Sequence, residues 1–394
     1  MIAVAPGEPD TQVESRVCLR GDSVRRLAVP KHDGPDLLIF TSALALLTVG
    51  LVMVFSASAP MAFHEYGDSL YFLKRQLFWS LLGAVAMIVT MNVDYHVYQR
   101  FPVAIYLAAL AGLALVLIPG VGSVAGGARR WIVIYGPIRI QPSEVAKIAL
   151  VIVLAYYLSR IRTGVETFTW GVAVPLALAA LPVGLIVLEP DLGTGVALLA
   201  VSLIMLFLGA AKIAHLLLLV PPAAAMLVWL IVAEEYRFRR YMAFIDPWSD
   251  PLDTGYHVIQ SLLALGSGGI FGLGLGMSRQ KYHYLPETHT DFVFSILGEE
   301  LGFVGCTLVI ALFFVFAWRG MRAALKAPDR FGRLLCAGLT CAITFQALMN
   351  IGVVTSSIPI TGISLPLISS GGSSLTVTMA SIGIILNVSR QSVV

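Results

Sequence analysis

The sequence predicts an all-α polytopic membrane protein with about ten transmembrane helices. Of its 394 residues, 58% are hydrophobic and only 12% are charged, whereas about a quarter of the residues in a soluble domain are charged. Apolar runs recur along nearly the whole chain, and each approaches the roughly 20 residues that a helix needs to cross a bilayer. The runs are continuous and rich in Leu, Ala and Val. This pattern excludes a β-barrel, whose strands would alternate apolar and polar residues.

Ten helices are expected in a single domain over residues 37–390, which follows a flexible cytoplasmic tail over residues 1–36. The tail is polar and lacks the apolar core of a cleavable signal peptide. The predicted helices cover residues 37–58, 71–91, 101–119, 144–159, 169–188, 192–209, 212–232, 292–317, 334–354 and 366–388.

The distribution of Lys and Arg predicts that both termini are cytoplasmic. With this orientation, 15 of the 26 basic residues lie on the inner side. They are Arg16, Arg20, Arg25, Arg26, Lys31, Arg100, Arg160, Arg162, Lys212, Arg319, Arg322, Lys326, Arg330, Arg333 and Arg390. The net charge of +3 is too small to indicate nucleic-acid binding.

The first long outer connection, residues 120–143, carries Arg129, Arg130 and Arg139, which are candidates for binding an anion. Glu144 and Lys147 follow at positions i and i+3 on one helix face. Two structural interpretations stay open. In the first, Pro142 begins the helix, and Glu144 and Lys147 form an ion pair with no further role. In the second, Trp131 is an aromatic anchor at the membrane interface beside snorkelling arginines.

The stretch EPDLGT, Glu189 to Thr194, is expected to form a tight turn between two helices. A helix-capping role for Asp191 is favoured over chemistry, and the role of Glu189 is open.

The second long outer connection, residues 233–291, contains an amphipathic segment from Tyr256 to Leu265, which we expect along the membrane interface. Its glycine-rich part, Gly266 to Gly276, has the composition of a nucleotide-binding loop. No strand precedes it, however, and the expected side of the membrane lacks ATP. Close backbone packing is therefore the favoured interpretation.

The stretch LPETHTDFVFSILGEELGF, Leu285 to Phe303, is unusually rich in ionisable residues for the start of a membrane helix. Thr290 is expected as the N-cap, which places Asp291 in the first turn, where it would interact favourably with the helix dipole. Glu299 and Glu300 lie roughly 12 to 14 Å further along the helix. Buried carboxylates in membrane helices are rare unless paired or functional, so one is expected to pair with a cation or a backbone donor.

The stretch from Thr355 to Ser374 has no charge, two prolines and many small hydroxyl residues. Such a composition does not suit a spanning helix throughout. A segment that exposes its backbone to a cavity fits it better.

These motifs, in this order, resemble the FtsW/RodA/SpoVE (SEDS) family of polytopic membrane proteins over about residues 37–390. They are GARRWI followed by IQPSE and Lys147, EPDLGT, GSGGIFGLGLG, LPETHTDFVFSILGEELG and PLISSGGSS. The stretch SRQKYHYLPETHTDF and Gly298 before Glu299 resemble the FtsW branch more than RodA, and the long tail agrees with that branch.

The resemblance implies a peptidoglycan glycosyltransferase that polymerises lipid II on the outer face of the bacterial inner membrane at the division septum. It implies a class B penicillin-binding protein of the FtsI type as transpeptidase partner, together with FtsQ, FtsL, FtsB and FtsN-type division proteins and membrane lipids. Asp291, in the HTDF motif, would be the catalytic carboxylate, as a general base or as the ligand of a divalent cation such as Mg or Mn. No other cofactor is expected.

The resemblance also suggests a substrate-binding set and a supporting set. The first comprises Arg129, Arg130, Trp131, Gln141, Glu144, Lys147, Glu189, His289, Ser370, Gly371 and Gly372. The second comprises Arg75, Asp191, Glu287, Glu299 and Glu300.

Two functions of other classes stay open, a lipid II flippase and a scaffold for division proteins. Intramembrane charges are equally expected of a transporter. A flippase should need comparable polar groups facing inward, so the clustering of charge on one face favours the enzyme.

Overall fold

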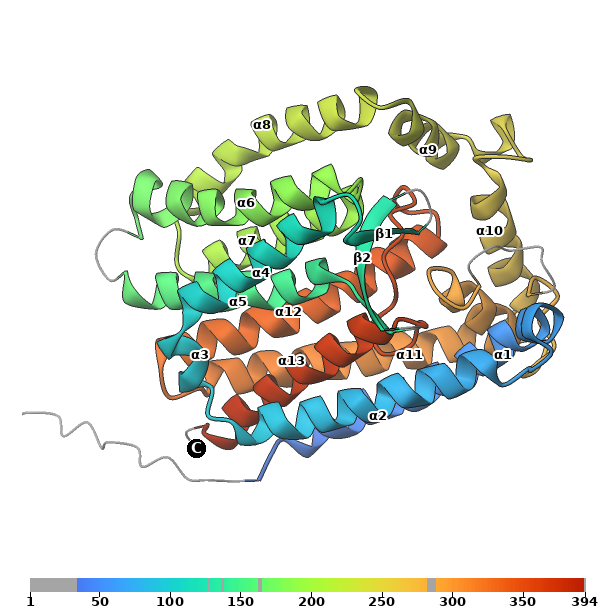
Figure 1. Ribbon diagram of the computed structural model, residues 1–394, viewed down its shortest axis with the longest axis horizontal. Helices are drawn as coiled ribbons and strands as arrows, with labels where there is room; N and C mark the ends of the chain where they lie inside the picture. The colour runs from blue at the N-terminus through green and yellow to red at the C-terminus, as the bar shows by residue number, and fades with distance from the viewer. Residues whose placement is uncertain (1–33, 126–127, 136–137, 162–164, 282–287, 393–394) are drawn as a thin grey trace, which may run out of the picture.

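The computed structural model describes residues 34–125, 128–135, 138–161, 165–281 and 288–392. Ten long helices in this part of the chain correspond one to one to the ten predicted spans and run side by side as a bundle (Figure 1). They are α1 (Leu37–Tyr66), α2 (Tyr71–Asn92), α4 (Pro102–Leu117), α5 (Pro142–Arg160), α6 (Val174–Leu188), α7 (Leu192–Leu208), α8 (Ile213–Val232), α11 (Val293–Leu325), α12 (Arg330–Val354) and α13 (Gly372–Arg390).

Eight helical spans, with the π-helical turn η1 (Thr169–Ala173) counted as the start of α6, are long and apolar enough to cross a membrane. The other two, α4 and α7, have 16 and 17 residues. Both are shorter than the roughly 20 residues that span a bilayer without thinning it. The prediction of a polytopic all-α membrane protein is confirmed.

Three shorter helices complete the α structure of the described chain: α3 (His96–Arg100), α9 (Glu235–Ile245) and α10 (Tyr256–Gly268). A 3-10 turn, η2 (Pro247–Ser249), lies between α9 and α10. Helix α10 is the predicted amphipathic segment, and it packs Val258, Ile259 and Ala264 inward beside α11.

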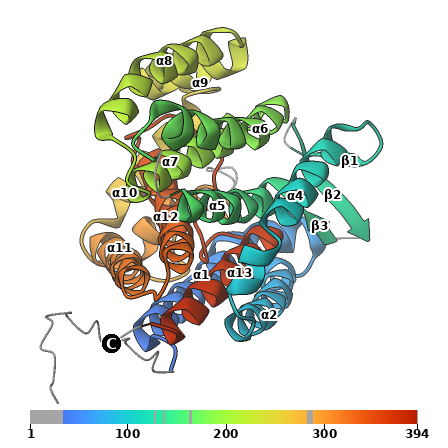
Figure 2. The same ribbon diagram turned by 90° about the vertical axis from the view of Figure 1, so that its left-hand side faces the viewer.

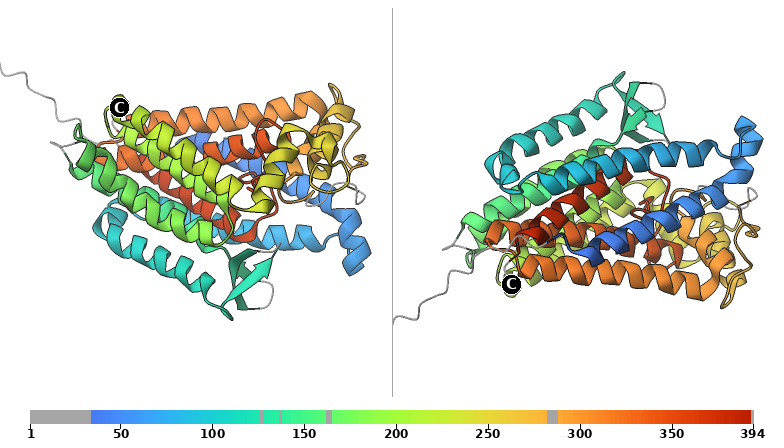
Figure 3. Two further views of the ribbon diagram at one scale, coloured as in Figure 1. Left: turned by 90° about the horizontal axis from the view of Figure 1, so that it is seen from above. Right: turned by 90° about the horizontal axis from the view of Figure 1, so that it is seen from below.

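A small sheet, which the sequence analysis did not predict, occupies the connection between α4 and α5. Its antiparallel strands β1 (Gly122–Ala125), β2 (Ala128–Tyr135) and β3 (Ile138–Ile140) follow the order β1-β2-β3. Residues such as Trp131 and Ile132 favour extended structure. The sheet projects from the bundle beyond the end of α4 (Figure 3).

The bundle is not uniformly packed. Helices α5, α12 and α13 lie near its centre, and most of their residues are buried. Helix α8 has no buried residue and lies along the periphery, away from α5 and α12 (Figure 2). An apolar helix that buries nothing within the protein must face lipid on most of its surface.

The first and last described residues meet at one end of the bundle. The backbone nitrogen of Asp36 donates to Ser389 Oγ at 3.2 Å, and Arg319 NH2 lies 2.5 Å from Asp36 Oδ2. An even number of spans brings the chain back to its starting side.

Helix α11 is kinked at Gly302, which has φ 67° and ψ −164°. The kink frees the carbonyls of Glu299 and Glu300, which accept from the nitrogens of Leu273 and Gly274 at 3.0 Å each. A Cβ on Gly302 would overlap the backbone nitrogen of Gly272. The glycine-rich segment therefore packs backbone to backbone on the kink, as predicted.

Candidate functional site

A cavity of about 290 Å³ opens at the end of the bundle opposite the chain ends. Segments far apart in the sequence build it: β2, the first turns of α5 and α7, the turn before α11, the middle of α12 and the segment 355–371. Eight of the predicted site residues line this cavity: Trp131, Gln141, Glu144, Lys147, Asp191, Asp291, Ser370 and Gly371.

Asp291 lies in a turn just before α11, which begins at Val293. The predictions of Thr290 as N-cap and of Asp291 in the first helical turn are wrong. The physical reason is competition for the backbone. Thr290 O accepts from Ser369 Oγ at 2.6 Å and Asp291 O accepts from Asn350 Nδ2 at 2.7 Å. Both carbonyls therefore bond to side chains of other segments and not to backbone nitrogens of the helix.

The non-helical segment 355–371 forms one wall of the cavity, as predicted for a cavity-lining stretch. Its Ser370 nitrogen donates to His289 O at 2.8 Å, which fixes the segment against the turn that carries Asp291. The backbone at Gly362, with φ 72°, passes so close that a Cβ there would lie 3.6 Å from Asp291 Oδ2. Helix α13 consequently begins at Gly372, six residues later than predicted.

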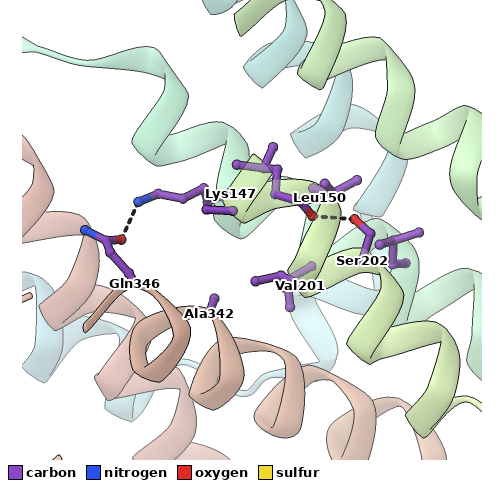
Figure 4. A pocket seen from close by; sticks show the side chains of 10 residues that line it. Lys147, Leu150, Val201, Ser202, Ala342 and Gln346 are labelled. Carbon is purple, nitrogen blue, oxygen red and sulfur yellow. Dashed lines mark hydrogen bonds between the residues drawn. The ribbon is translucent and has the colours of Figure 1, made fainter. Parts of the chain in front are cut away.

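Lys147 stands at the floor of the cavity with two partners. Its Nζ lies 2.8 Å from Glu144 Oε2. It also donates to Gln346 Oε1 at 2.6 Å (Figure 4). The helix does start at Pro142, and the i, i+3 ion pair is present. However, the second partner in α12 means that the pair is not merely self-satisfied.

Arg130 organises the turn between α6 and α7. Its NH2 donates to Pro190 O at 2.5 Å, its Nε donates to Glu189 O at 3.4 Å, and its NH1 lies 3.7 Å from Asp191 Oδ2. Asp191 caps α7 by accepting from the Thr194 nitrogen at 3.1 Å, as favoured from the sequence.

Glu189, in the same turn, is 1% exposed, and neither carboxyl oxygen has a hydrogen-bond partner among the described residues. Burial, and then the neighbouring Asp191 charge, raise the pKa of Glu189 to about 8, with Arg130 acting in the opposite direction.

Glu299 and Glu300 belong to a buried cluster behind the cavity, outside its lining. Glu300 accepts from Ser56 Oγ of α1 at 2.7 Å and pairs with Lys281 Nζ at 3.1 Å. Glu299 accepts from Ser278 Oγ at 2.5 Å and from the Arg279 nitrogen at 2.8 Å. The expected pairing of these carboxylates is confirmed. Through these bonds, residues 278–281, which follow the glycine-rich segment, are held against α1 and α11.

The remaining predicted residues lie away from the cavity lining. Arg129 and Arg139 are exposed on β2 and β3, and Arg75 is exposed on α2. The ring of His289 packs against Phe72, with ring centroids 4.6 Å apart. Gly372 lies against Trp79, whose ring a Cβ would overlap. Glu287 is outside the described residues.

The described residues offer few ligands for a divalent cation. No group of three or more His, Cys, Asp or Glu side chains gathers in them. Of the carboxylates that line the cavity, Glu144 is paired with Lys147 and Asp191 caps α7. Asp291 lines the cavity as well, and an ion held there would take its other ligands from substrate phosphates or water.

Gln346 and Asn350 touch Lys147 and the backbone of Asp291, and they were not predicted as site residues. They are the two amide side chains of the predicted span 334–354, at positions i and i+4. Polar amides in a membrane helix seek partners within the protein. That spacing was the available signal.

The FtsW/RodA/SpoVE family model, described as "cell cycle protein", matches residues 36–393. Stage V sporulation protein E of Bacillus subtilis is 46% identical over 362 residues, which are 92% of this chain and 99% of that protein. The probable peptidoglycan glycosyltransferase FtsW of Geobacter metallireducens is 45% identical over 356 residues, which are 90% of this chain and 95% of that protein.

Two solved structures share the fold. A chain from "Structural coordination of polymerization and crosslinking by a peptidoglycan synthase complex" matches with a TM-score of 0.75 at 31% identity, over 90% of this chain and 98% of that chain. The rod shape determining protein RodA of Thermus thermophilus matches with a TM-score of 0.67 at 30% identity, over 91% of this chain and 97% of that chain. With a family model that matches residues 36–393, and with relatives and structures that each cover 90% or more of the chain, this protein belongs to the FtsW/RodA/SpoVE family.

Proposed function

We propose that this protein is a peptidoglycan glycosyltransferase that polymerises lipid II. The observation that carries the proposal is that the Asp291 carboxylate and the Lys147 ammonium line the same cavity. The names of the FtsW relatives support the same activity. Both charges are held where a membrane helix bundle opens, which suits a substrate with a lipid tail and a polar head.

The reaction joins the acceptor sugar to the donor sugar with inversion at the anomeric carbon. Asp291 takes the proton from the acceptor 4-hydroxyl, and the resulting oxygen attacks the donor anomeric carbon. The bond from that carbon to the lipid pyrophosphate breaks, and the undecaprenyl pyrophosphate leaves with its electron pair. Lys147 stabilises the negative charge on the departing phosphate through a charge-assisted hydrogen bond.

Arg130 has a supporting part in this proposal, although the sequence analysis grouped it with the substrate-binding residues. Its guanidinium already donates to two backbone carbonyls of the turn at Glu189 and Pro190. It fixes the rim of the cavity and adds positive potential beside the site of the pyrophosphate. A divalent cation held by Asp291 would supply further charge neutralisation there.

The proposal also gives the protein an orientation. The cavity faces outward from the bacterial inner membrane and both termini are cytoplasmic, because the opposite end of the bundle carries the basic residues Arg319, Arg322, Lys326 and Arg330. Division is the favoured cellular setting, with a class B penicillin-binding protein of the FtsI type and the FtsQ, FtsL, FtsB and FtsN-type proteins as partners.

The flippase alternative is less well supported. Below Lys147 the space between α5, α7 and α12 is lined almost entirely by apolar side chains, among them Leu150, Val201 and Ala342 (Figure 4). A polar head group has no continuous hydrophilic route through this region.

The experiment is polymerisation of labelled lipid II by the purified protein together with its penicillin-binding partner, whose transpeptidase site is blocked. Glycan strands should form only when this protein is present. Lipid II crossing vesicle membranes without any glycan product would support the flippase in its place.

A further inference from the structure

Helix α12 carries two amide side chains one helical turn apart, Gln346 and Asn350, on the face directed at the cavity. They are 6% and 1% exposed, within a helix whose other buried residues are mostly apolar. Together they make four hydrogen bonds to three other segments. Neither residue has a place in the chemistry described above.

Gln346 connects α5 to the segment 355–371. Its Oε1 accepts from Lys147 Nζ at 2.6 Å (Figure 4). Its Nε2 donates to Ser364 O at 3.0 Å. The amide is therefore the second partner of the Lys147 ammonium, beside Glu144, whose Oε2 lies 2.8 Å from the same nitrogen, and the two partners together fix its position.

Asn350 connects the same segment to the turn before α11. Its Nδ2 donates to Asp291 O at 2.7 Å and to Ile363 O at 2.8 Å. Both donor hydrogens are used, so the amide ties the Asp291 backbone to the residue that precedes Ser364. The consecutive carbonyls of Ile363 and Ser364 thus bind two amides that one rigid helix holds at a fixed separation.

We propose that Gln346 and Asn350 form a brace that sets the separation between the Lys147 ammonium and the Asp291 carboxylate. They are positioning residues, because each acts on the substrate through another side chain. The brace rests on the proposed function: transfer requires the base at the acceptor hydroxyl and the cation at the leaving phosphate at the same time, and a misplacement of about 1 Å can cost on the order of 10²-fold in rate.

The alternative explanation is purely structural: the two amides only satisfy the backbone carbonyls of non-helical segments. The two explanations differ in the pattern of kinetic effects. A purely structural role lowers stability and reduces turnover and binding together in either variant. In the brace, Gln346 acts on the group that binds phosphate, whereas Asn350 acts on the group that takes the proton.

The test compares Gln346→Leu and Asn350→Leu in the full-length protein with its penicillin-binding partner. Asn350→Leu should lower kcat by about tenfold or more and leave lipid II affinity within about threefold, because it loosens only the Asp291 turn. Gln346→Leu should weaken lipid II binding by about fivefold or more with a smaller change in kcat, because the Lys147 ammonium then loses the partner that fixes its position beside Glu144. Thr344→Val is the matched control, since the Thr344 hydroxyl bonds only to Thr340 O of its own helix.

Amide hydrogen exchange tests the brace without any measurement of enzyme turnover. Amide hydrogen exchange at residues 291–293 should speed up in Asn350→Leu and stay unchanged in Thr344→Val. If Asn350→Leu fails to accumulate, Asn350→Ser, which keeps one donor, should show the same exchange effect to a smaller extent. Equal losses of binding and turnover in both Leu variants, or no loss in either with unchanged exchange, would overturn the brace. Wild-type protein that makes no glycan refutes the proposed function, and the exchange result then still decides whether Asn350 holds the turn.

Discussion

At the scale of single residues, Lys147 is the group on which substrate affinity should depend most. Lys147→Met removes the ammonium and keeps most of the length of the side chain. We expect lipid II affinity to fall by about 10- to 100-fold, since a hydrogen bond to a charged group contributes about 1.5 to 3 kcal/mol. Isothermal titration or a filter-binding assay in detergent measures the change.

Lys74→Met is the control for that substitution, because Lys74 is 65% exposed and pairs with Asp68 outside the cavity. Affinity for lipid II that is the same in both variants would remove Lys147 from the binding site.

Glu189 should make stability depend on pH. Its carboxyl has a pKa of about 8 in the folded protein, raised from 4.5. Between pH 4.5 and pH 8, the folded protein therefore keeps a proton on Glu189 that the unfolded chain has lost. Stability should therefore fall as pH rises from about 4.5 to 8. Thermal unfolding of Glu189→Gln at pH 5 and at pH 9 should show a smaller difference than the wild type does. An identical pH dependence in the two proteins would contradict the buried, unpartnered state of Glu189.

Much of the candidate site was predictable from residue types, because charged and small polar residues stand out in an apolar chain. Asp291, Lys147 and Glu144 were found in this way, and they do line one cavity. Arg129 and His289 were grouped with them, but they point elsewhere. Their sequence neighbourhood does not encode the strand face or the packing on Phe72 that removes them from the lining.

At the scale of elements, the kink in α11 should depend on the absence of a side chain at Gly302. Gly302→Ala would place a Cβ in the left-handed region and against the backbone of Gly272. We expect a loss of stability of about 1 to 3 kcal/mol, seen as a lower melting temperature. Gly266→Ala, in α10, is the control, because a Cβ there meets nothing within 4 Å. Equal melting temperatures for the two variants would show that the kink tolerates a side chain.

The spans themselves were the easiest elements to predict, since bilayer thickness fixes their length and composition. The β1-β2-β3 sheet was missed because its strands are short and two of them, β1 and β3, have only four and three residues. The start of α11 was misplaced because Thr290 is a good capping residue locally. Asn350 and Ser369, which hold that turn open, are distant in the sequence.

At the scale of the whole molecule, the proposal requires the cavity and the chain ends to lie on opposite sides of the membrane. With the native cysteines replaced, a cysteine at Asp68 should react with an impermeant maleimide added outside intact spheroplasts. A cysteine at Gln391 should react only after the membrane is opened. The reverse pattern would turn the cavity toward the cytoplasm and remove lipid II polymerisation outside the membrane from consideration.

The central claim is that the charge of Asp291 drives glycan polymerisation. The most direct measurement is the rate of lipid II polymerisation by Asp291→Asn with its penicillin-binding partner, beside Asp68→Asn as a control at the same end of the bundle. The backbone carbonyl at position 291 still accepts from Asn350, so the fold should be retained. We predict that the rate falls by at least about 10²-fold, as when a positioned general base is removed, while lipid II binding and association with the partner persist. A rate for Asp291→Asn close to that of the wild type would contradict the account.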